Sequence, residues 1–167
     1  MRTFGFTGSQ TIAFPSMQKH ELVRWLQTNT KPGDKLLHGD CLGADEFVHH
    51  IALALNLRIV IYPANIPGKR ARCHGASEVH APNDPLARND IIARECDELV
   101  AMPRVQQEEL RSGTWATIRY ALKYGKGVTI IGPQAAVNLP PGTRTPADRV
   151  GRHAKLQTRA VDPVSQR

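Results

Sequence analysis

The hydrophobic positions along the chain follow two patterns that together are typical of a layered α/β protein. Short runs of consecutive apolar residues are typical of strands covered on both faces, and apolar residues three or four apart are typical of helices. The expected strands are 2–6, 35–38, 58–62, 98–102 and 128–131, and the expected helices are 17–29, 44–55, 86–96 and 113–124. Because strands and helices alternate through short links, the sequence predicts a single Rossmann-like three-layer α/β sandwich with a mainly parallel five-stranded sheet.

The second expected helix has the clearest apolar face. Phe47, Ile51 and Leu55 follow one another at intervals of four residues and are flanked by small apolar residues. This spacing places them on one side of a helix, which we expect to pack on the sheet. His49 and His50 fall outside this stripe, so we expect them to face solvent.

Three segments lie outside these elements. Residues 64–85 form a long stretch without apolar period, which is usually functional or mobile, and 103–112 is a polar loop. Residues 132–167 are rich in Pro, Gly, Thr and Arg and carry six Lys and Arg against two Asp, which predicts a loosely ordered basic tail after a domain spanning 1–131. We interpret the tail as a solvated extension, with weak nucleic-acid contact as the alternative.

Composition places the chain among small intracellular proteins. Its 167 residues are the size of one domain, and no apolar run approaches the length of a membrane span. The N-terminus lacks the order of charges and apolar residues typical of a secretory signal, and an odd number of cysteines, three, argues against a disulfide framework. We therefore expect a cytoplasmic protein without a membrane partner. The His and Cys spacings fit no metal motif, so we expect neither a metal nor a cofactor.

Candidate chemistry gathers where strands lead into helices, because open α/β sheets bind ligands beyond the carboxyl ends of their strands. Gly8 and Ser9 follow the first strand, and Gly113 and Thr114 open the last helix. Small residues at such turns let backbone N–H groups approach a phosphate, which the positive end of a helix also favours. For the first loop, an ordinary strand-to-helix turn is an equally good interpretation.

The loop after the second strand offers glycines and carboxylates. Gly39 and Gly43 allow close packing against a flat ligand, and Asp40 or Asp45 can accept hydrogen bonds from ribose hydroxyls. Asp45 also has a purely structural interpretation, since a carboxylate in the first turn of a helix interacts favourably with its dipole. Arg88, near the start of another helix, is unfavourable to that dipole and is better placed to hold an anion.

Taken together, these loops resemble the SLOG superfamily, a Rossmann-like group that includes the LOG phosphoribohydrolases and the DprA/Smf proteins. The segments that carry the resemblance are GFTGS, HGDCLGAD, LARNDIIARECDELVAMP and SGTWATIRYALKYGKGVTII, which span residues 2–131. Gly39 and Gly43 match the family's glycine loop, Arg88 its arginine, and Gly113 with Thr114 its Gly-Thr pair. Within this superfamily, the chain is most similar to the compact branch from bacteria and phages that is inferred to bind nucleotides.

The chain departs from the LOG enzymes at the residue that carries their chemistry. Their catalytic glutamate lies three residues after the Thr of the Gly-Thr pair, where this chain has Thr117. The resemblance therefore disfavours cleavage of nucleoside monophosphates by the LOG mechanism. If the chain is an enzyme, we expect Arg88 to grip the phosphate. The carboxylate that hydrolysis requires must then come from one of five residues: Asp40, Asp45, Asp90, Glu108 or Glu109. We favour Asp45 and Asp90, because both lie at helix starts beside the expected phosphate loops.

These observations predict a protein that binds a nucleotide or nucleotide-derived phosphate ligand at the carboxyl edge of the sheet, with N-glycosidic hydrolysis left open. The alternative is a DprA-like nucleic-acid-binding accessory protein that uses the basic run 69–72 and the tail. A third alternative is a sensor without activity whose ligand alters an interface. We expect a homo-oligomer, since exposed helices of such sheets commonly pair.

Overall fold

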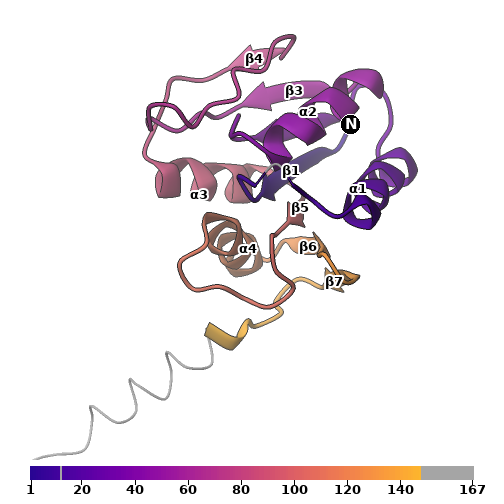
Figure 1. Ribbon diagram of the computed structural model, residues 1–167, viewed down its shortest axis with the longest axis vertical. Helices are drawn as coiled ribbons and strands as arrows, with labels where there is room; N and C mark the ends of the chain where they lie inside the picture. Colours follow the sequence, from indigo (N-terminus) through magenta and orange to yellow (C-terminus); the bar gives the residue numbers. More distant parts are fainter. Residues whose placement is uncertain (12, 148–167) are drawn as a thin grey trace, which may run out of the picture.

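The fold is an α/β sandwich built on one twisted sheet (Figure 1). The computed structural model describes residues 1–11 and 13–147. The strands are β1 (Thr3–Gly8), β2 (Lys35–His38), β3 (Arg58–Ile61), β4 (Glu78–Val79), β5 (Glu98–Met102), β6 (Gly127–Ile131) and β7 (Ala136–Leu139). The helices are α1 (Ser16–Asn29), α2 (Ala44–Ala54), α3 (Pro85–Glu95) and α4 (Gly113–Lys123).

The sheet confirms the expected mainly parallel Rossmann-like class but corrects the number of strands. Its order is β4-β3-β2-β1-β5-β6-β7, seven strands instead of five, and every pair is parallel except β6 with β7. β4 has only two residues, both exposed, and β7 is an exposed edge strand, so neither produces an apolar run in the sequence. β7 falls in the segment expected to be a tail, and the part of that tail from 148 to 167 lies outside the described residues.

Two apolar layers hold the helices to the sheet. Phe4 and Phe6 of β1 belong to a buried cluster with α1 and α2 on one face, whereas Leu99 and Ala101 of β5 belong to a second cluster with α3 and α4 on the other. Side chains alternate between the two faces along each strand, as the pleat requires. The three layers therefore agree with the expected sandwich.

The buried face of α2 is rotated from the expected stripe. Its fully buried apolar residues are Ala44, Val48 and Ala52, while Phe47, Ile51 and Leu55 are only partly buried. The small side chains let the helix approach the sheet closely, so they occupy the centre of the contact and the large ones its margin. Residue size, which hydrophobic spacing ignores, decides which neighbouring stripe faces inward.

His49 is fully buried, so the expectation that it faces solvent is wrong. The Asp40 amide donates to Nδ1 of His38, which leaves the proton of His38 on Nε2 for donation to Nδ1 of His49 at 3.0 Å. Nε2 of His49 in turn donates to the carbonyl of His74 at 2.8 Å. Both imidazoles are thus neutral and fully hydrogen-bonded, which is how a polar side chain can be buried outside the apolar stripe.

The strand order places a crevice beside β1. From β1 the chain first adds β2, β3 and β4 on one side and then crosses over to add β5 and β6 on the other. The carboxyl ends of β1 and β5 meet at this reversal, where the Ser9 amide donates to the Met102 carbonyl at 3.1 Å. Ligands of open α/β sheets bind outside the strand ends at such a reversal.

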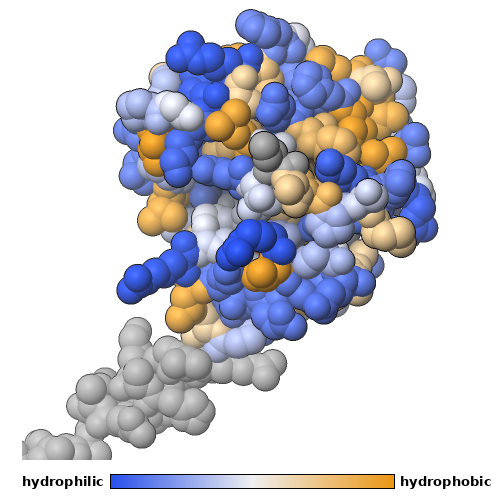
Figure 2. Space-filling view, viewed as in Figure 1, coloured by the Kyte–Doolittle hydropathy of each residue, from blue (hydrophilic) through white to orange (hydrophobic). Residues whose placement is uncertain are grey.

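Figure 2 shows hydrophilic and hydrophobic residues intermixed over the face in view. Among the residues that the structure describes, no helix has both the length and the apolar character needed to cross a bilayer.

Candidate functional site

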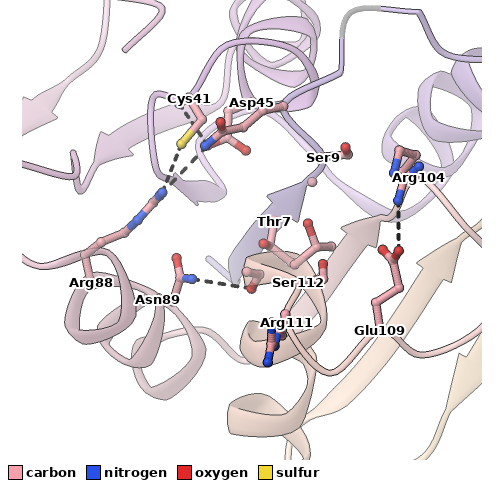
Figure 3. A pocket seen from close by; sticks show the side chains of 14 residues that line it. Thr7, Ser9, Cys41, Asp45, Arg88, Asn89, Arg104, Glu109, Arg111 and Ser112 are labelled. Carbon is pink, nitrogen blue, oxygen red and sulfur yellow. Dashed lines mark hydrogen bonds and ion pairs between the residues drawn. The ribbon is translucent and has the colours of Figure 1, made fainter. Parts of the chain in front are cut away.

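A cavity of about 380 Å³ opens at the carboxyl edge of the sheet, where the strand order reverses (Figure 3). Five segments, all following strand ends or opening helices, contribute to its wall. The lining residues are Thr7, Gly8, Ser9, Gln10, Cys41, Asp45, Arg88, Asn89, Arg104, Glu109, Arg111, Ser112, Gly113 and Thr114. The structure therefore brings together Gly8, Ser9, Asp45, Arg88, Gly113 and Thr114 from the residues that the sequence predicted.

The N-terminus of α4 forms one side of the cavity. The Ser112 side chain caps this helix by accepting a hydrogen bond from the Trp115 amide at 3.4 Å. The first amides of a helix have no intrahelical acceptor, so those of Gly113 and Thr114 can donate to a ligand. Together with the helix dipole, they make this wall attractive to an anion.

Arg88 lies on the opposite wall, on α3. Asp84 caps α3 through the amides of Leu86 and Ala87, which fixes the first turn and places Arg88 at its end. One guanidinium nitrogen, Nη2, lies 2.9 Å from the Cys41 sulfur, and Nη1 lies 4.0 Å from the Asp45 carboxylate. The buried Nε has no hydrogen-bond partner among the described residues. The guanidinium therefore retains hydrogen-bonding capacity beside the cavity.

Asp45 is the carboxylate that the structure places closest to Arg88. It is buried, and its Oδ2 accepts hydrogen bonds from the amides of Gly39 and Cys41, each at 3.1 Å. Burial raises the pKa of Asp45 above its ordinary value, and the nearby Arg88 only partly offsets this effect. A carboxyl group with a raised pKa at a cavity can donate as well as accept a proton.

Cys41 is a packed thiol at the same wall. Burial, with a smaller contribution from Asp45, raises the pKa of Cys41, against the opposing effect of Arg88. Because the thiolate is the nucleophilic form, this environment disfavours a nucleophilic role. The geometry supports the interpretation of Cys41 as a small side chain that fills space beside Arg88.

The loop 103–112 supplies two arginines, Arg104 and Arg111, to which the sequence analysis assigned no role. Arg104 forms an ion pair with Glu109 at 2.8 Å, whereas Arg111 is exposed and makes no ion pair within residues 1–11 and 13–147. The order of elements could have indicated both arginines, because a loop joining a parallel strand to the next helix must begin at the carboxyl edge. Asn89 of α3 also lines the cavity, and its side-chain amide donates to the Gly113 carbonyl at 3.4 Å.

Asp40 and Asp90 lie outside the cavity lining. The Asp40 carboxylate accepts hydrogen bonds from the Arg70 side chain at 2.8 Å and the Cys73 amide at 2.9 Å, which ties the loop 64–85 to the end of β2. Burial acts to raise the pKa of Asp40, but these hydrogen bonds outweigh it and hold the pKa below its ordinary value. Asp90 accepts from the Tyr124 hydroxyl at 2.6 Å instead.

Gly39 and Gly43 support the cavity wall from behind instead of lining it. A Cβ at position 39 would overlap the guanidinium of Arg88, and one at position 43 would collide with the Thr11 carbonyl. Gly43 also has a φ of +87°, a conformation that favours glycine. These glycines therefore serve close packing within the protein.

Thr117 occupies the position of the LOG glutamate but does not reach the cavity. It is fully buried, donates to the Gly113 carbonyl at 2.9 Å and accepts from the Thr7 hydroxyl at 3.3 Å. Both of its hydrogen bonds are internal, so this residue braces the start of α4 against β1.

The described part of the chain offers no metal centre. Within it, no three His, Cys, Asp or Glu side chains are arranged so that they could hold a metal ion. The cavity offers guanidinium groups, hydroxyls and backbone amides, which bind anions, and its two carboxylates, Asp45 and Glu109, each lie beside an arginine.

Comparison with known proteins establishes the fold. No family model and no curated protein sequence matches the chain. The X-ray structure of TM1055, a structural genomics target, matches with a TM-score of 0.56 at 20% identity over 77% of this chain and 72% of the other. DNA processing protein A from Helicobacter pylori, studied for its single-stranded DNA binding mode, matches with a TM-score of 0.52 at 20% identity over 77% of this chain and 64% of its own.

The chain shares a Rossmann-like fold with TM1055 and with DNA processing protein A. This confirms the fold class expected from the sequence. At 20% identity the likeness carries no residue roles, so the function of this chain is argued from its own cavity.

Proposed function

We propose that this protein binds a nucleotide or nucleotide-derived phosphate ligand in the cavity at the end of β1 and β5. The observation that carries the proposal is the convergence of the α4 N-terminus, Arg88 and Arg111 on one cavity of about 380 Å³. Each of these features attracts an anion, and a cavity of this size admits a ligand of nucleotide dimensions.

The charges around the cavity support an anionic ligand. Glu109 is paired with Arg104, and Asp45 lies beside Arg88, so each carboxylate has a guanidinium partner. Of the three arginines that line the cavity, Arg111 is the one without a carboxylate partner among the described residues. A phosphate between Arg111 and the amides of Gly113 and Thr114 would satisfy all three donors.

The opposite wall suits the sugar of such a ligand. Asp45 offers a carboxylate and Asn89 an amide on the side of the cavity formed by α2 and α3. Hydroxyl groups of a ribose can donate to the first and exchange hydrogen bonds with the second. We place the phosphate at α4 and the ribose toward Asp45.

Binding, and not rapid hydrolysis, is the function that the chemistry of the cavity supports. N-glycosidic hydrolysis needs a carboxylate that orients water, and Thr117 supplies none. Asp45 is the predicted catalytic carboxylate that lines the cavity, but the Gly39 and Cys41 amides and Arg88 already engage it. Glu109, the other carboxylate of the lining, is paired with Arg104. Any turnover would therefore depend chiefly on Asp45 and be slow.

Nucleic-acid binding is the second candidate, supported by the fold shared with a protein that binds single-stranded DNA. The basic run at 69–72 is less free than its sequence suggests, because Arg70 is paired with the buried Asp40 at 2.8 Å. Lys69 and Arg72 are exposed, and aromatic residues for base stacking make up only 5% of the chain. The cavity is the stronger site.

Calorimetry tests the proposal with a panel of nucleoside mono-, di- and triphosphates and ADP-ribose, against the same nucleosides without phosphate. We expect phosphate-dependent binding that Arg111→Gln weakens by about fivefold to tenfold, the loss of one charge-assisted contact. Arg58→Gln, which removes an exposed arginine at the start of β3, is the matched control. A folded protein that binds no member of the panel, with an unchanged melting temperature, would rule the proposal out.

A further inference from the structure

A second cavity, of about 300 Å³, lies beside α4 and the edge strand β7. Its wall is mostly apolar and includes Trp115 of α4, Ile130 of β6, and Val137 and Leu139 of β7. The loop 103–112 contributes to this cavity through Gln106, Gln107 and Glu108, whereas other residues of the same loop line the phosphate cavity. The two cavities are therefore distinct, with no lining residue in common.

Trp115 leaves a polar group unsatisfied in this apolar wall. Trp115 is only 5% exposed, and its indole N–H is buried without a hydrogen-bond acceptor among the described residues. The great majority of buried donors in proteins are paired, because a donor removed from water without an acceptor costs free energy. An acceptor supplied by a bound molecule would remove this cost.

Arg144 adds a positive charge to the same cavity. It is exposed and forms no ion pair or hydrogen bond with the rest of the described chain. A cation beside an apolar cavity favours a ligand with an apolar body and an acidic group. The charge and the unsatisfied N–H thus point to the same kind of molecule.

We propose that the cavity between α4, β6 and β7 binds a small apolar carboxylate, either aromatic or branched aliphatic. The apolar body lies against Ile130, Val137 and Leu139, and the carboxylate accepts hydrogen bonds from the Trp115 indole and Arg144. The site needs no nucleotide in the first cavity, so it stands independently of the function proposed above.

Nuclear magnetic resonance tests the site with naphthalene-2-carboxylate as the probe. The chain contains two tryptophans, so Trp25 provides an internal control for the indole N–H resonance of Trp115. We expect the Trp115 resonance to shift and saturate as the probe is added, and the Trp25 resonance to remain in place. If the Trp115 resonance does not move at about 5 mM probe, any binding is weaker than millimolar and the proposal is overturned. Equal shifts of both resonances also overturn it.

Variants separate the two features of the ligand. Arg144→Gln is expected to raise the Kd by about fivefold or more, since it removes one charge-assisted contact. Val137→Phe places a ring in the cavity and is expected to abolish binding, whereas Val79→Phe, the same change on exposed β4, leaves it intact. Naphthalene-2-carboxamide is the neutral probe: affinity equal to that of the carboxylate would overturn the assignment of an anionic ligand.

Discussion

The guanidinium of Arg88 lies against Gly39, in the space that a Cβ at position 39 would occupy. The glycine loop and the arginine of the sequence are thus two halves of one packing arrangement between the end of β2 and the start of α3. Gly39 is needed here for space, since its φ lies outside the positive range that favours glycine. The arrangement holds Arg88 beside Cys41 and Asp45 at the cavity wall.

Gly39→Ala is expected to displace Arg88 and weaken binding of the phosphate ligand by about tenfold, because the added methyl group overlaps the guanidinium and moves a charge-assisted donor. Calorimetry with the best ligand of the panel measures the change. Gly127→Ala is the control, since a Cβ there meets nothing closer than 4.0 Å. Equal affinities in the two variants would mean that the position of Arg88 is irrelevant to the ligand.

Arg88→Ala is expected to raise the Kd by at least about tenfold, corresponding to a lost contact of about 1.5 to 3 kcal/mol. It should also lower the melting temperature, because Asp45 stays buried after losing its cation. The double variant Arg88→Ala with Asp45→Asn separates the two effects. We expect it to recover melting temperature without recovering affinity, and a recovery of affinity would contradict the role of Arg88.

The hydrophobic pattern was sufficient for the layers but not for the edges of the sheet. The five strands it predicts are all present, because each is covered by helices on both faces and is therefore buried and mainly apolar after its first residue. β7 was missed because Ala136–Leu139 are largely exposed and therefore form no buried apolar run, although β7 follows β6 directly and pairs with it in an antiparallel hairpin.

The sequence predicts which edge of the sheet carries the candidate site, but not which side chains contact one another there. Gly8, Ser9, Gly113 and Thr114 line the cavity because strand ends of a parallel sheet share one edge. The two aspartates of the second loop could not be told apart by sequence: a positive φ of 56° at Asp40 turns its side chain to Arg70, while Asp45 faces Arg88. Backbone conformation decided which carboxylate reached the cavity.

Turnover of nucleoside monophosphates is expected to be slow or absent in the unmodified protein, since Thr117 is buried behind the cavity wall. Release of free base, followed by chromatography, measures it. Any slow release should be lost in Asp45→Asn, which keeps the shape of the side chain. It should persist in Asp90→Asn, because the Asp90 carboxylate accepts a hydrogen bond from the Tyr124 hydroxyl and does not line the cavity. Rapid release that survives both substitutions would show that neither aspartate replaces the glutamate.

The His38–His49 pair predicts a loss of stability in mild acid. Burial, His49 and Arg88 lower the pKa of His38 from 6.5 to about 3, against a smaller opposing effect of Asp40. Below pH 6.5 the unfolded chain therefore binds a proton that the folded chain does not, so the free energy of unfolding falls as the pH falls toward 3. His38 contributes at most about 1.4 kcal/mol per pH unit to the change in the free energy of unfolding.

Chemical denaturation between pH 7 and 4 measures this slope, and imidazole resonances identify its source. His38 should remain neutral throughout that range, whereas Asp45, with its raised pKa, acts in the opposite direction wherever it titrates. His20, an exposed histidine of α1, serves as the reference for an accessible ring. Titration of His38 near pH 6.5 in the folded protein would contradict the buried neutral pair.

Removal of residues 148–167 distinguishes the two candidate functions. These residues carry five Lys and Arg against two Asp, and the cut leaves β7 in the chain, unlike a cut at 132. If the cavity is the functional site, the Kd for the phosphate ligand should change by less than about twofold, because every residue that lines the cavity remains in the shortened chain. If the chain instead holds a nucleic-acid backbone, binding to a single-stranded oligonucleotide should weaken, and the dependence of log K on log salt should become shallower by about 0.7 per lost phosphate contact.

A shallower slope together with an unaltered ligand Kd would assign the tail to nucleic acid and the cavity to the nucleotide. Loss of ligand affinity on this cut would contradict a site formed by Arg88, Arg111 and the start of α4 alone.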